Sequence, residues 1–392
     1  MKYPLSFNTW NSEEKRAVIK VLNSGNFTMG SEVNKFENNF ANYFKSKYAV
    51  MVNSGSSANL LMLSALRYCE GLIKKKNKPN IIVPSVGWST SYFPISQNGF
   101  KLNFVDIDQD TLNIDTKKIE NSIDNNTVAI LAINLLGNPC NFEKLKKISK
   151  KYNLLLLEDN CESMGAKYNN KFSGTFGKMS SHSLFFAHHM QTMEGGVILT
   201  DDTYLKDFLK SLRAHGWCRN LPKKNKIYKF SNDDFLDKFV FVTPGYSLRP
   251  LEMEGAVGSI QLRKLKKFLK IRLDNAKIFK HYFENKEWCS IQKEEKNSTS
   301  SWYGFNILLK GSLANKRKKI VDKLLSNKIE VRPTMTGDFT KNPVIKYLDY
   351  KCKYKLNSSM NIDQNGFFVG NYPKDLSKEI EQLFNYIKKE VS

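Results

Sequence analysis

Short apolar runs alternate with segments of helical periodicity along the larger, N-terminal part of the chain. The apolar runs, from about residue 46 onward, are KYAVMVNS, NIIVPSV, KLNFVDI, TVAILAINL, NLLLLED and GGVILT. Several are continuous rather than alternating, which is typical of strands buried on both faces of a largely parallel sheet. The segments EVNKFENNFANYF, NFEKLKKISKKY and DTYLKDFLKSLRAHG repeat apolar residues at helical spacing and would cover that sheet. The pattern predicts an α/β fold with a mostly parallel central sheet.

The pattern of apolar and polar residues changes after about residue 262. Long basic amphipathic helices (KLKKFLKIRLDNAKIFKHYF) are followed by one strand-like stretch, SWYGFNILLK, and by a helix–strand unit, KRKKIVDKLLSNKIEVRP. This mixture predicts a smaller α+β domain. We therefore expect an N-terminal arm and a large domain over residues 1–262 and a small C-terminal domain over residues 263–392. No internal repeat or low-complexity linker separates them, so we expect the two domains to pack closely.

Charge and composition narrow the classes of function. The 392 residues carry a formal net charge of +23, which raises the question of nucleic-acid binding. The lysines are spread along the chain in runs such as KKKNK and KLKKISKK, without a helix-turn-helix, RNP or zinc-finger pattern. We expect no nucleic-acid partner, although the positive field would favour an anionic small substrate. The N-terminal region has no signal-peptide pattern and no long apolar stretch occurs, so we expect a cytoplasmic protein without a membrane span.

Six cysteines are scattered along the chain without a CxxC motif or a close cluster. They are Cys69, Cys140, Cys161, Cys218, Cys289 and Cys352. This spacing argues against a zinc ribbon, an iron–sulfur cluster and a disulfide framework. We expect reduced thiols and no metal site.

Two polar stretches follow apolar runs, where ligands gather in sheets of this kind. NSGSSANL (53–60) opens a helix after a strand, so the backbone of Gly55, Ser56 and Ser57 could hold a phosphate; a serine-rich helix cap is the alternative. LLLLEDNCES (154–163) places Asp159 at the end of a strand. A protonated ring nitrogen would compensate its charge there, and a plain capping role is the alternative.

Two further stretches supply an aromatic ring and imidazoles. SVGWSTS (85–91) puts Trp88 beyond a strand, where its ring could stack on a flat ligand or be buried in the core. HSLFFAHHMQTMEGGVILT (182–200) contains His188 and His189, two of the chain's five histidines. Imidazole moves protons near neutral pH, so the pair is a candidate for acid–base catalysis, with a surface turn as the alternative.

The order of these motifs resembles the sugar aminotransferases of the DegT/DnrJ/EryC1/StrS family, which are fold-type-I enzymes dependent on pyridoxal 5'-phosphate. The resemblance runs along essentially the whole chain, through FTMGSEVNKFENNFANYF, YAVMVNSGSSANLL, IIVPSVGWST, FVDIDQDTLNID, LLGNPCNFEKL, LLEDNCESMGA, GTFGKMSSHSLFF, EGGVILTDD and PGYSLRPLEMEGAVG. It implies a cofactor phosphate held at Gly55, Ser56 and Ser183, with Ser57 beside them. It further implies that Trp88 stacks on the pyridine ring and that Asp159 pairs with the ring nitrogen. Glu162 stands where the family usually has a glutamine near the cofactor's 3-hydroxyl.

His188 departs from the family's ordinary pattern. Six residues before the glutamate of EGG, ordinary members carry the lysine that binds the cofactor covalently, and imidazole cannot form that stable Schiff base. Imidazole can still take and give a proton, so the resemblance implies pyridoxal and pyridoxamine 5'-phosphate held non-covalently. This is the pattern of the family's histidine-bearing sugar 3-dehydratases. They expel the C3 hydroxyl of a nucleotide-linked 4-keto-6-deoxy hexose and release ammonia.

The cysteine pattern separates two branches of that subgroup. One branch carries an iron–sulfur cluster on closely spaced cysteines, and none of the six here has that spacing. The other recharges its cofactor from L-glutamate and acts on GDP-4-keto-6-deoxymannose in colitose synthesis for surface polysaccharide. SHSLFFAHHMQTMEGGVI, RAHGWCRNLPKKNK and PGYSLRPLEM resemble this second branch. We therefore expect a glutamate-dependent 3-dehydratase of a GDP-linked sugar.

The resemblance also implies substrate contacts and a second subunit. A guanidinium group binds a carboxylate well, and the resemblance implies that His215 and Arg249 contact glutamate. It implies that Arg219 contacts the nucleotide-sugar. The alternative is that these residues are a helix-end histidine and surface ion pairs. Further candidates on the sugar-nucleotide side are Gly25, Asn26, Phe27, Thr28, Met29 and Glu330. The family forms homodimers with shared active sites. Family members usually have an asparagine that donates to the cofactor phosphate in the neighbouring subunit, and Ser247 stands at that position here. The shorter serine hydroxyl could donate directly or through water.

Other functions stay open at this point. The fold is also compatible with an aminotransferase in which another lysine serves, or with a dehydratase of another nucleotide or sugar. A different class would be a non-catalytic family member that acts as a binding subunit. The nucleotide base and the sugar stereochemistry cannot be read from the sequence. The role of His189 stays open, with help in lining the phosphate site as one option.

Overall fold

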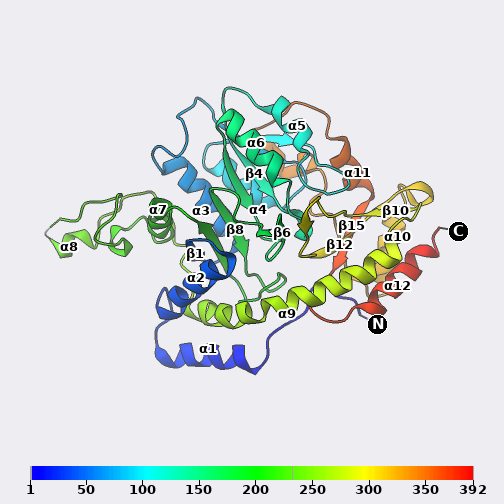
Figure 1. Cartoon of the computed structure of the whole chain (residues 1–392), viewed down its shortest axis with the longest axis horizontal. Coiled ribbons are helices and arrows are strands. Elements are labelled where there is room, and N and C mark those ends of the chain that lie inside the picture. Colours follow the sequence, from blue (N-terminus) through cyan, green and yellow to red (C-terminus); the bar gives the residue numbers. More distant parts are fainter. Residues whose placement is uncertain (1, 232, 392) are drawn as a thin grey trace.

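The computed structural model describes residues 2–231 and 233–391, and a central eight-stranded sheet organises most of them (Figure 1). Its order is β1-β9-β8-β5-β4-β2-β3-β14. Neighbouring strands are parallel except at β9, which runs antiparallel to β1 and β8. The bounds are β1 Tyr48–Val52, β2 Asn80–Pro84, β3 Lys101–Val105, β4 Thr127–Ile133, β5 Leu155–Asp159, β8 Met179–Ser183, β9 Gly196–Thr200 and β14 Tyr350–Cys352.

Strands with unbroken apolar sequences lie inside this sheet, as the sequence predicts. Every residue of β2, β4 and β9 is buried. One strand lacks an apolar signature, because β8 reads MSSHS and is nevertheless buried throughout. Its polar side chains are satisfied internally: Ser180 Oγ donates to the Gly174 carbonyl at 2.5 Å, and Ser181 Oγ donates to Asn59 Oδ1 at 2.6 Å. Hydrophobic periodicity therefore misses β8.

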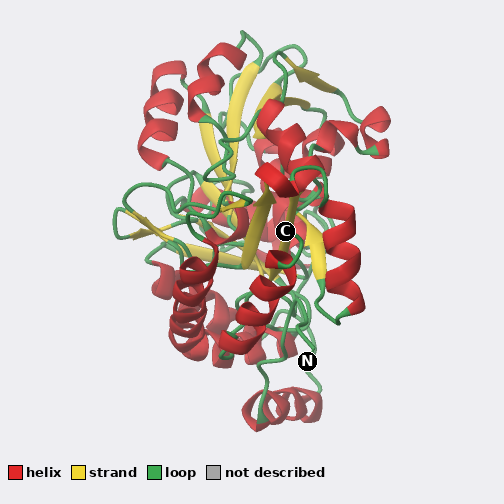
Figure 2. Cartoon of the chain, turned by 90° about the vertical axis from the view of Figure 1, so that its right-hand side faces the viewer, coloured by secondary structure: helices red, strands yellow, loops and turns green. Residues whose placement is uncertain are grey.

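Helices cover both faces of the sheet, which explains the continuous apolar strands (Figure 2). On one face lie α3 (Gly55–Tyr68), α4 (Ser89–Gln97) and α7 (Thr203–Arg213), which share one core with the strands. The other face carries α2 (Ser31–Phe44), α5 (Thr116–Ser122), α6 (Phe142–Tyr152) and the N-terminal part of α9 (Glu252–Phe283).

The 32-residue helix α9 joins the two parts of the molecule (Figure 1). Helix α9 begins before residue 262, the position at which the pattern of apolar and polar residues changes. The Glu252 carboxylate accepts hydrogen bonds of 2.6 to 2.9 Å from three N–H groups at the start of α2, those of Gly30, Glu32 and Val33. A carboxylate at this end of a helix stabilises it, so Glu252 locks α2 to α9. The helix α1 (Ser12–Ser24) also packs along α9.

A second, antiparallel sheet lies beyond α9. Its order is β10 (Cys289–Ile291), β12 (Gly304–Leu309), β15 (Gly366–Gly370) and β13 (Val331–Pro333). Helices α10 (Arg317–Ser326) and α11 (Asn357–Asn365) contact its strands, and α12 (Ser377–Lys388) lies against α9 and α10. Short 3₁₀ helices lie at Leu135–Gly137, Cys218–Asn220, Gly311–Leu313, Phe339–Lys341 and Pro343–Tyr347.

Two short strands from the C-terminal region cross back to the large domain. β14 extends the central sheet beside β3, and β11 (Ser298–Thr299) pairs with the hairpin of β6 (Lys167–Tyr168) and β7 (Lys171–Phe172). The two predicted domains pack closely, as expected, but the division between residues 262 and 263 stays a prediction.

The segment formed by residues 214–231 and 233–250 projects from the large domain and carries α8 (Asp234–Asp237) near its tip (Figure 1). Four large apolar side chains in or near α8 are exposed by more than half: Phe235, Leu236, Phe239 and Phe241. Several large exposed apolar side chains in one short segment are typical of an interaction site.

In residues 2–231 and 233–391, no helix is long and apolar enough to cross a membrane. Over the same residues, no three His, Cys, Asp or Glu side chains are grouped to hold a metal ion. All six cysteines are free thiols.

Candidate active site

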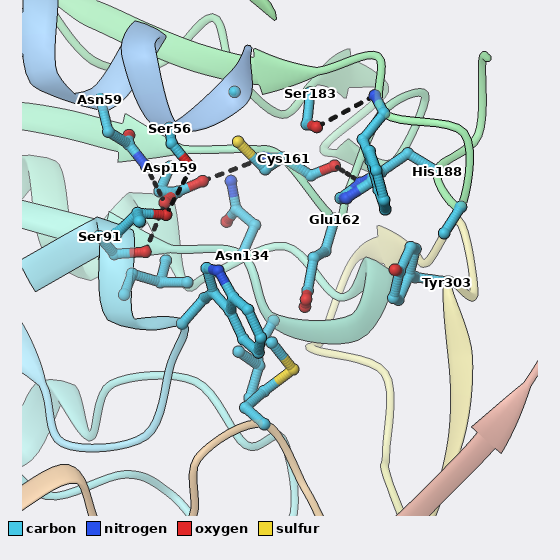
Figure 3. Close-up of a pocket in the computed structure, with 18 of the residues that line it drawn as sticks. Ser56, Asn59, Ser91, Asn134, Asp159, Cys161, Glu162, Ser183, His188 and Tyr303 are labelled. Atoms are coloured by element: carbon cyan, nitrogen blue, oxygen red, sulfur yellow. Dashed lines mark hydrogen bonds between the residues drawn. The ribbon is translucent and has the colours of Figure 1, made fainter. Parts of the chain in front are cut away.

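A cavity of about 320 Å³ opens where β1, β4, β5 and β8 end, and residues of the second sheet close its far side (Figure 3). Parallel strands bring their carboxyl ends to one edge of a sheet, so the polar residues that follow each strand meet there. The lining residues that the sequence predicted are Gly55, Ser56, Trp88, Asp159, Glu162, Ser183 and His188.

Asp159 ends β5 and is almost fully buried. Its Oδ2 atom accepts hydrogen bonds from Asn59 Nδ2 and Ser91 Oγ, both at 2.7 Å, and its Oδ1 atom accepts one from the Cys161 N–H at 3.1 Å (Figure 3). Asn59 is in turn oriented by Ser181 on β8. These donors fix the carboxylate and leave acceptor capacity for one more donor from the cavity. A protonated ring nitrogen fits that place.

The N-terminus of α3 packs against the end of β8 at the wall of the cavity. Gly55 lies so close to Ser183 that an added Cβ atom would stand 2.6 Å from the Ser183 Cβ atom, so only glycine fits. The same is true one strand over, where a Cβ atom on Gly196 would meet the Ser54 carbonyl oxygen at 2.2 Å. Both contacts bring the start of α3 against the end of β8 and the start of β9. Free N–H groups in the first turn of a helix form a ready anion site.

The serines of this turn have different roles. Ser54 caps α3, because its Oγ atom accepts a hydrogen bond from the Ser57 N–H at 3.0 Å. Ser57 is therefore engaged in the cap and does not line the cavity. Ser56 is exposed and lines it, and its hydroxyl donates to Thr90 Oγ1 at 2.9 Å.

Trp88 stands at the N-cap position of α4 with 48% of its surface exposed. The alternative of burial in the core is therefore wrong. An exposed indole that lines a cavity can stack on a flat ring.

The His188 ring is held by a single backbone carbonyl. Its Nδ1 atom lies 2.8 Å from the Cys161 oxygen, and a carbonyl only accepts, so Nδ1 carries the proton and Nε2 keeps a lone pair. Burial and, to a smaller extent, the Arg272 cation lower the pKa of His188 to about 4. The Cys161 carbonyl and the Asp159 charge act in the opposite direction but do not offset the effect of burial. At neutral pH, His188 is a neutral base on the cavity wall.

His189 is buried and does not line the cavity. Its Nε2 atom lies 3.3 Å from the Ser301 carbonyl oxygen and therefore carries the proton. Burial lowers the pKa of His189 well below its usual value. The surface-turn alternative for the histidine pair is wrong, since one ring faces the cavity and the other is enclosed.

Glu162 also lines the cavity, and its Oε2 atom accepts a hydrogen bond from the Leu136 N–H at 2.9 Å. Burial raises the pKa of Glu162 to about 8, and the Asp159 charge adds to this effect. At neutral pH the carboxyl group is therefore mostly protonated. A protonated carboxyl group has both a donor and an acceptor, like the carboxamide that the family usually places here.

Sequence reasoning did not single out several residues that complete the cavity. Asn59 and Ser91 hold Asp159, Tyr303 lies against His188, and Asn134 and Arg332 also line the walls. Each is a common residue type whose role depends on its neighbours in space. Among the lining residues in the described parts of the chain there is no lysine, and Arg332 is the one arginine.

Four predicted ligand-binding residues lie outside this cavity, at the base of the projecting segment. The Arg219 guanidinium stacks 3.6 Å from the centre of the Trp217 ring, and the His215 ring lies 4.6 Å from the same ring. Arg249 Nη2 donates to Ser247 Oγ at 3.4 Å, and the backbone next to His215 pairs with that of Ser247. The four residues form a second polar cluster.

The remaining candidates are also placed outside the cavity. The segment 25–29 lies beside the start of α9, where Thr28 bridges Leu251 and the Phe27 carbonyl accepts from the Glu252 N–H at 2.8 Å. Glu330 accepts a hydrogen bond from the Leu5 N–H at 3.1 Å and so ties the N-terminal arm to the second sheet.

Comparisons with known proteins agree with this geometry. The model of the DegT/DnrJ/EryC1/StrS aminotransferase family matches residues 8–388. The chain is 48% identical over 391 residues to GDP-4-keto-6-deoxy-D-mannose 3-dehydratase of Yersinia pseudotuberculosis, and the match covers 99% of each chain.

Two solved structures of GDP-4-keto-6-deoxymannose-3-dehydratase are similar at 47% identity. One is a histidine-to-asparagine variant with bound GDP-perosamine, with a TM-score of 0.95 and coverage of 98% of this chain and 100% of that one. The other holds a trapped PLP–glutamate geminal diamine, with a TM-score of 0.94 and the same coverage. The predicted resemblance and the predicted fold class, a fold-type-I PLP-dependent transferase, are thereby confirmed. The chain belongs to the DegT/DnrJ/EryC1/StrS aminotransferase family.

Proposed function

We propose that the chain is a glutamate-dependent 3-dehydratase of a nucleotide-linked 4-keto-6-deoxy hexose, with GDP-4-keto-6-deoxymannose as its substrate. It uses pyridoxal and pyridoxamine 5'-phosphate held without a covalent bond, and it releases ammonia and a 3-deoxy-4-keto sugar. The name of the Yersinia relative and the ligands of the two similar structures support this substrate, glutamate and this cofactor.

One observation carries the reaction class: the cavity presents an imidazole where an aminotransferase needs a lysine. A stable Schiff base requires a primary amine, and His188 offers only a ring nitrogen. Within the described residues, no lysine lines the cavity that could replace it. The protein can therefore move a proton beside the cofactor without binding it covalently. This speaks against the aminotransferase alternative.

The cavity residues fit the cofactor. The free N–H groups at the start of α3, with the hydroxyls of Ser56 and Ser183, suit its phosphate, and Trp88 suits its ring. The fixed Asp159 carboxylate suits its ring nitrogen. When bound, the pyridoxamine form supplies an amine and an electron-accepting ring, which together allow the C3 hydroxyl to leave.

The chain's own groups then handle protons. His188 Nε2 accepts the proton released at the cofactor's methylene carbon and can return it, while the bond from Nδ1–H to the Cys161 carbonyl keeps the ring in place. Burial ensures that the base is uncharged before the step. Glu162, protonated at neutral pH, supplies a hydrogen-bond donor near the base.

We further propose a homodimer in which each projecting segment reaches the partner's cavity. In a single chain the cluster of His215, Arg219 and Arg249 lies outside the cavity, so these residues contact glutamate or the nucleotide only if a second subunit supplies them. The exposed apolar patch around α8 supports this assembly. In it, Ser247 takes the place of the family's asparagine toward the partner's phosphate.

We place the enzyme in the cytoplasm, in the synthesis of a dideoxysugar such as colitose for surface polysaccharide. The free thiols of all six cysteines fit a reducing compartment. The GDP-linked substrate of the relatives supports a role among nucleotide sugars.

A direct assay tests the proposal. Purified protein is incubated with pyridoxal 5'-phosphate, L-glutamate and GDP-4-keto-6-deoxymannose, and ammonia, 2-oxoglutarate and the sugar product are measured. We expect equal amounts of the three, with slower turnover of the CDP- and dTDP-linked sugars. An amino sugar without ammonia would overturn the proposal in favour of an aminotransferase. A protein without bound cofactor or turnover would be a non-catalytic family member.

A further inference from the structure

Three successive carbonyl groups of residues 301–303 are each held by a different buried side chain. Those side chains are at most 2% exposed and come from the loop between β8 and β9, from α9 and from the residue that follows β15. The pairs are His189 Nε2 with the Ser301 oxygen at 3.3 Å, Asn371 Nδ2 with the Trp302 oxygen at 2.7 Å, and Arg272 Nη1 with the Tyr303 oxygen at 3.2 Å. The segment is therefore fixed along its length.

The opposite edge of the same segment is also held. The N–H groups of Ser301 and Tyr303 donate to the carbonyls of Gly137 and Leu136 at 2.9 and 3.1 Å. Trp302 adopts a left-handed φ of 47°, which a bulky residue keeps only when its surroundings impose it. The strain is consistent with a segment whose exact position matters.

This segment carries the ring that supports the catalytic base. The Tyr303 and His188 ring centroids are 5.1 Å apart, and Figure 3 shows the two rings side by side on the cavity wall. The His188 ring has one described hydrogen bond, at Nδ1, and that bond alone leaves the ring free to tilt about it. Contact with Tyr303 restricts that tilt and so sets the direction of Nε2. A small misplacement of a reacting group costs a large factor in rate.

We propose that His189 is a positioning residue for the dehydration: by holding the Ser301 carbonyl it keeps Tyr303 against the His188 ring, so that Nε2 points at the reacting carbon. The proposal rests on the function proposed above and assigns a task to the second histidine of the pair. In this account His188 moves the proton, and His189 fixes the position of the Tyr303 ring that contacts His188.

Two variants that differ by one methylene group test this role. In His189→Gln the amide nitrogen can reach the place of Nε2 and donate to the Ser301 carbonyl, whereas in His189→Asn it is too short to do so. We expect His189→Asn to lower kcat for ammonia release on the order of 10- to 100-fold with little change in KM, and His189→Gln to restore most of it. Equal kcat values for the two variants, or a loss confined to KM, would overturn the proposal.

A double-mutant cycle tests the path through Tyr303. If His189 acts through that ring, His189→Leu combined with Tyr303→Leu should cost hardly more than either change alone. The control is His182→Leu, which removes another fully buried imidazole that contacts Ser180 and Asn160 rather than the segment 301–303. Its effect should add to that of Tyr303→Leu. Additive effects for His189 and Tyr303 would contradict the proposal, and if His189→Leu does not fold, the Gln and Asn variants decide it.

The glutamate half-reaction separates this inference from the proposed function. Formation of 2-oxoglutarate from L-glutamate also needs His188 to move a proton, and it requires no sugar. If wild-type protein forms 2-oxoglutarate but dehydrates no sugar, the proposed function fails, while the Gln and Asn variants still test His189. If sugar is dehydrated normally by every His189 variant, the inference alone fails.

Discussion

The backbone of Cys161 connects Asp159 to His188. Its N–H donates to Asp159 Oδ1 at 3.1 Å, and its carbonyl accepts from His188 Nδ1 at 2.8 Å. One residue therefore orients both the carboxylate that suits the cofactor's ring nitrogen and the base that moves the proton. The turn at the end of β5 sets the distance between these two groups, so the reaction can depend on a fixed geometry.

The first prediction concerns the acid limb of the pH profile. Because burial and the Arg272 cation lower the pKa of His188 to about 4, against Asp159 and the Cys161 carbonyl, the base stays unprotonated well below neutral pH. We expect kcat for the glutamate half-reaction, measured at saturating glutamate, to be level from pH 7 down to about 5 and to fall only as the pH approaches about 4. Circular dichroism at each pH controls for unfolding. A limb near the ordinary histidine pKa of about 6.5 would contradict the assignment.

The second prediction concerns Glu162, whose pKa burial raises to about 8 in the folded protein, above the ordinary value of 4.5 for a glutamate side chain. The folded state then holds a proton that the unfolded state has lost, so wild-type stability should fall relative to Glu162→Gln as the pH rises from about 5 to about 8. Denaturant unfolding of cofactor-free protein at several pH values measures this. The Gln variant should keep most of its activity at neutral pH, since a carboxamide resembles the protonated carboxyl group. A stability difference that does not depend on pH would rule out the raised pKa.

The third prediction concerns the support of Asp159. Asn59→Ala removes a 2.7 Å hydrogen bond to the carboxylate. A bond to a charged group contributes about 1.5–3 kcal/mol, so cofactor affinity should fall roughly 10- to 100-fold. Absorbance titration with pyridoxal 5'-phosphate gives the Kd. The control is Asn98→Ala, another buried asparagine, which bonds only the Pro94 carbonyl and should leave the Kd unchanged.

The fourth prediction concerns the start of α3. Gly55→Ala places a Cβ atom 2.6 Å from the Ser183 Cβ atom, so helix and strand must separate. Overpacking of this kind costs about 1–3 kcal/mol of stability and should also open the phosphate site. Thermal unfolding with and without inorganic phosphate measures both effects. Full phosphate stabilisation in the variant would show that the phosphate binds elsewhere.

The sequence predicted those parts of the fold that carry their own signal. Continuous apolar runs identified β2, β4 and β5, because strands covered on both faces need apolar side chains throughout. The polar strand β8 was missed, since its serines are stabilised by partners such as Asn59 that only the folded chain brings near. The short strand β14 was missed for a similar reason, because it is placed by pairing with β3 rather than by its own pattern.

The site shows the same division. Asp159 is the last residue of a strand and Trp88 lies shortly beyond one, so their position at the sheet's edge could be predicted. Tyr303 and Arg332 enter the cavity from the second sheet, and no spacing in the sequence relates them to His188. The sequence could not predict that His189 is buried either, because its hydrogen-bond partner Ser301 lies far along the chain.

Borohydride reduction followed by intact-mass measurement tests the central claim most directly. Wild-type protein with bound pyridoxal 5'-phosphate should gain no covalent cofactor mass, since His188 cannot form the Schiff base that borohydride traps. His188→Lys, under the same conditions, should gain one cofactor per chain at residue 188 and should release no ammonia from the sugar. A covalent cofactor adduct on any lysine of the wild-type protein, or continued dehydration by His188→Lys, would contradict the account.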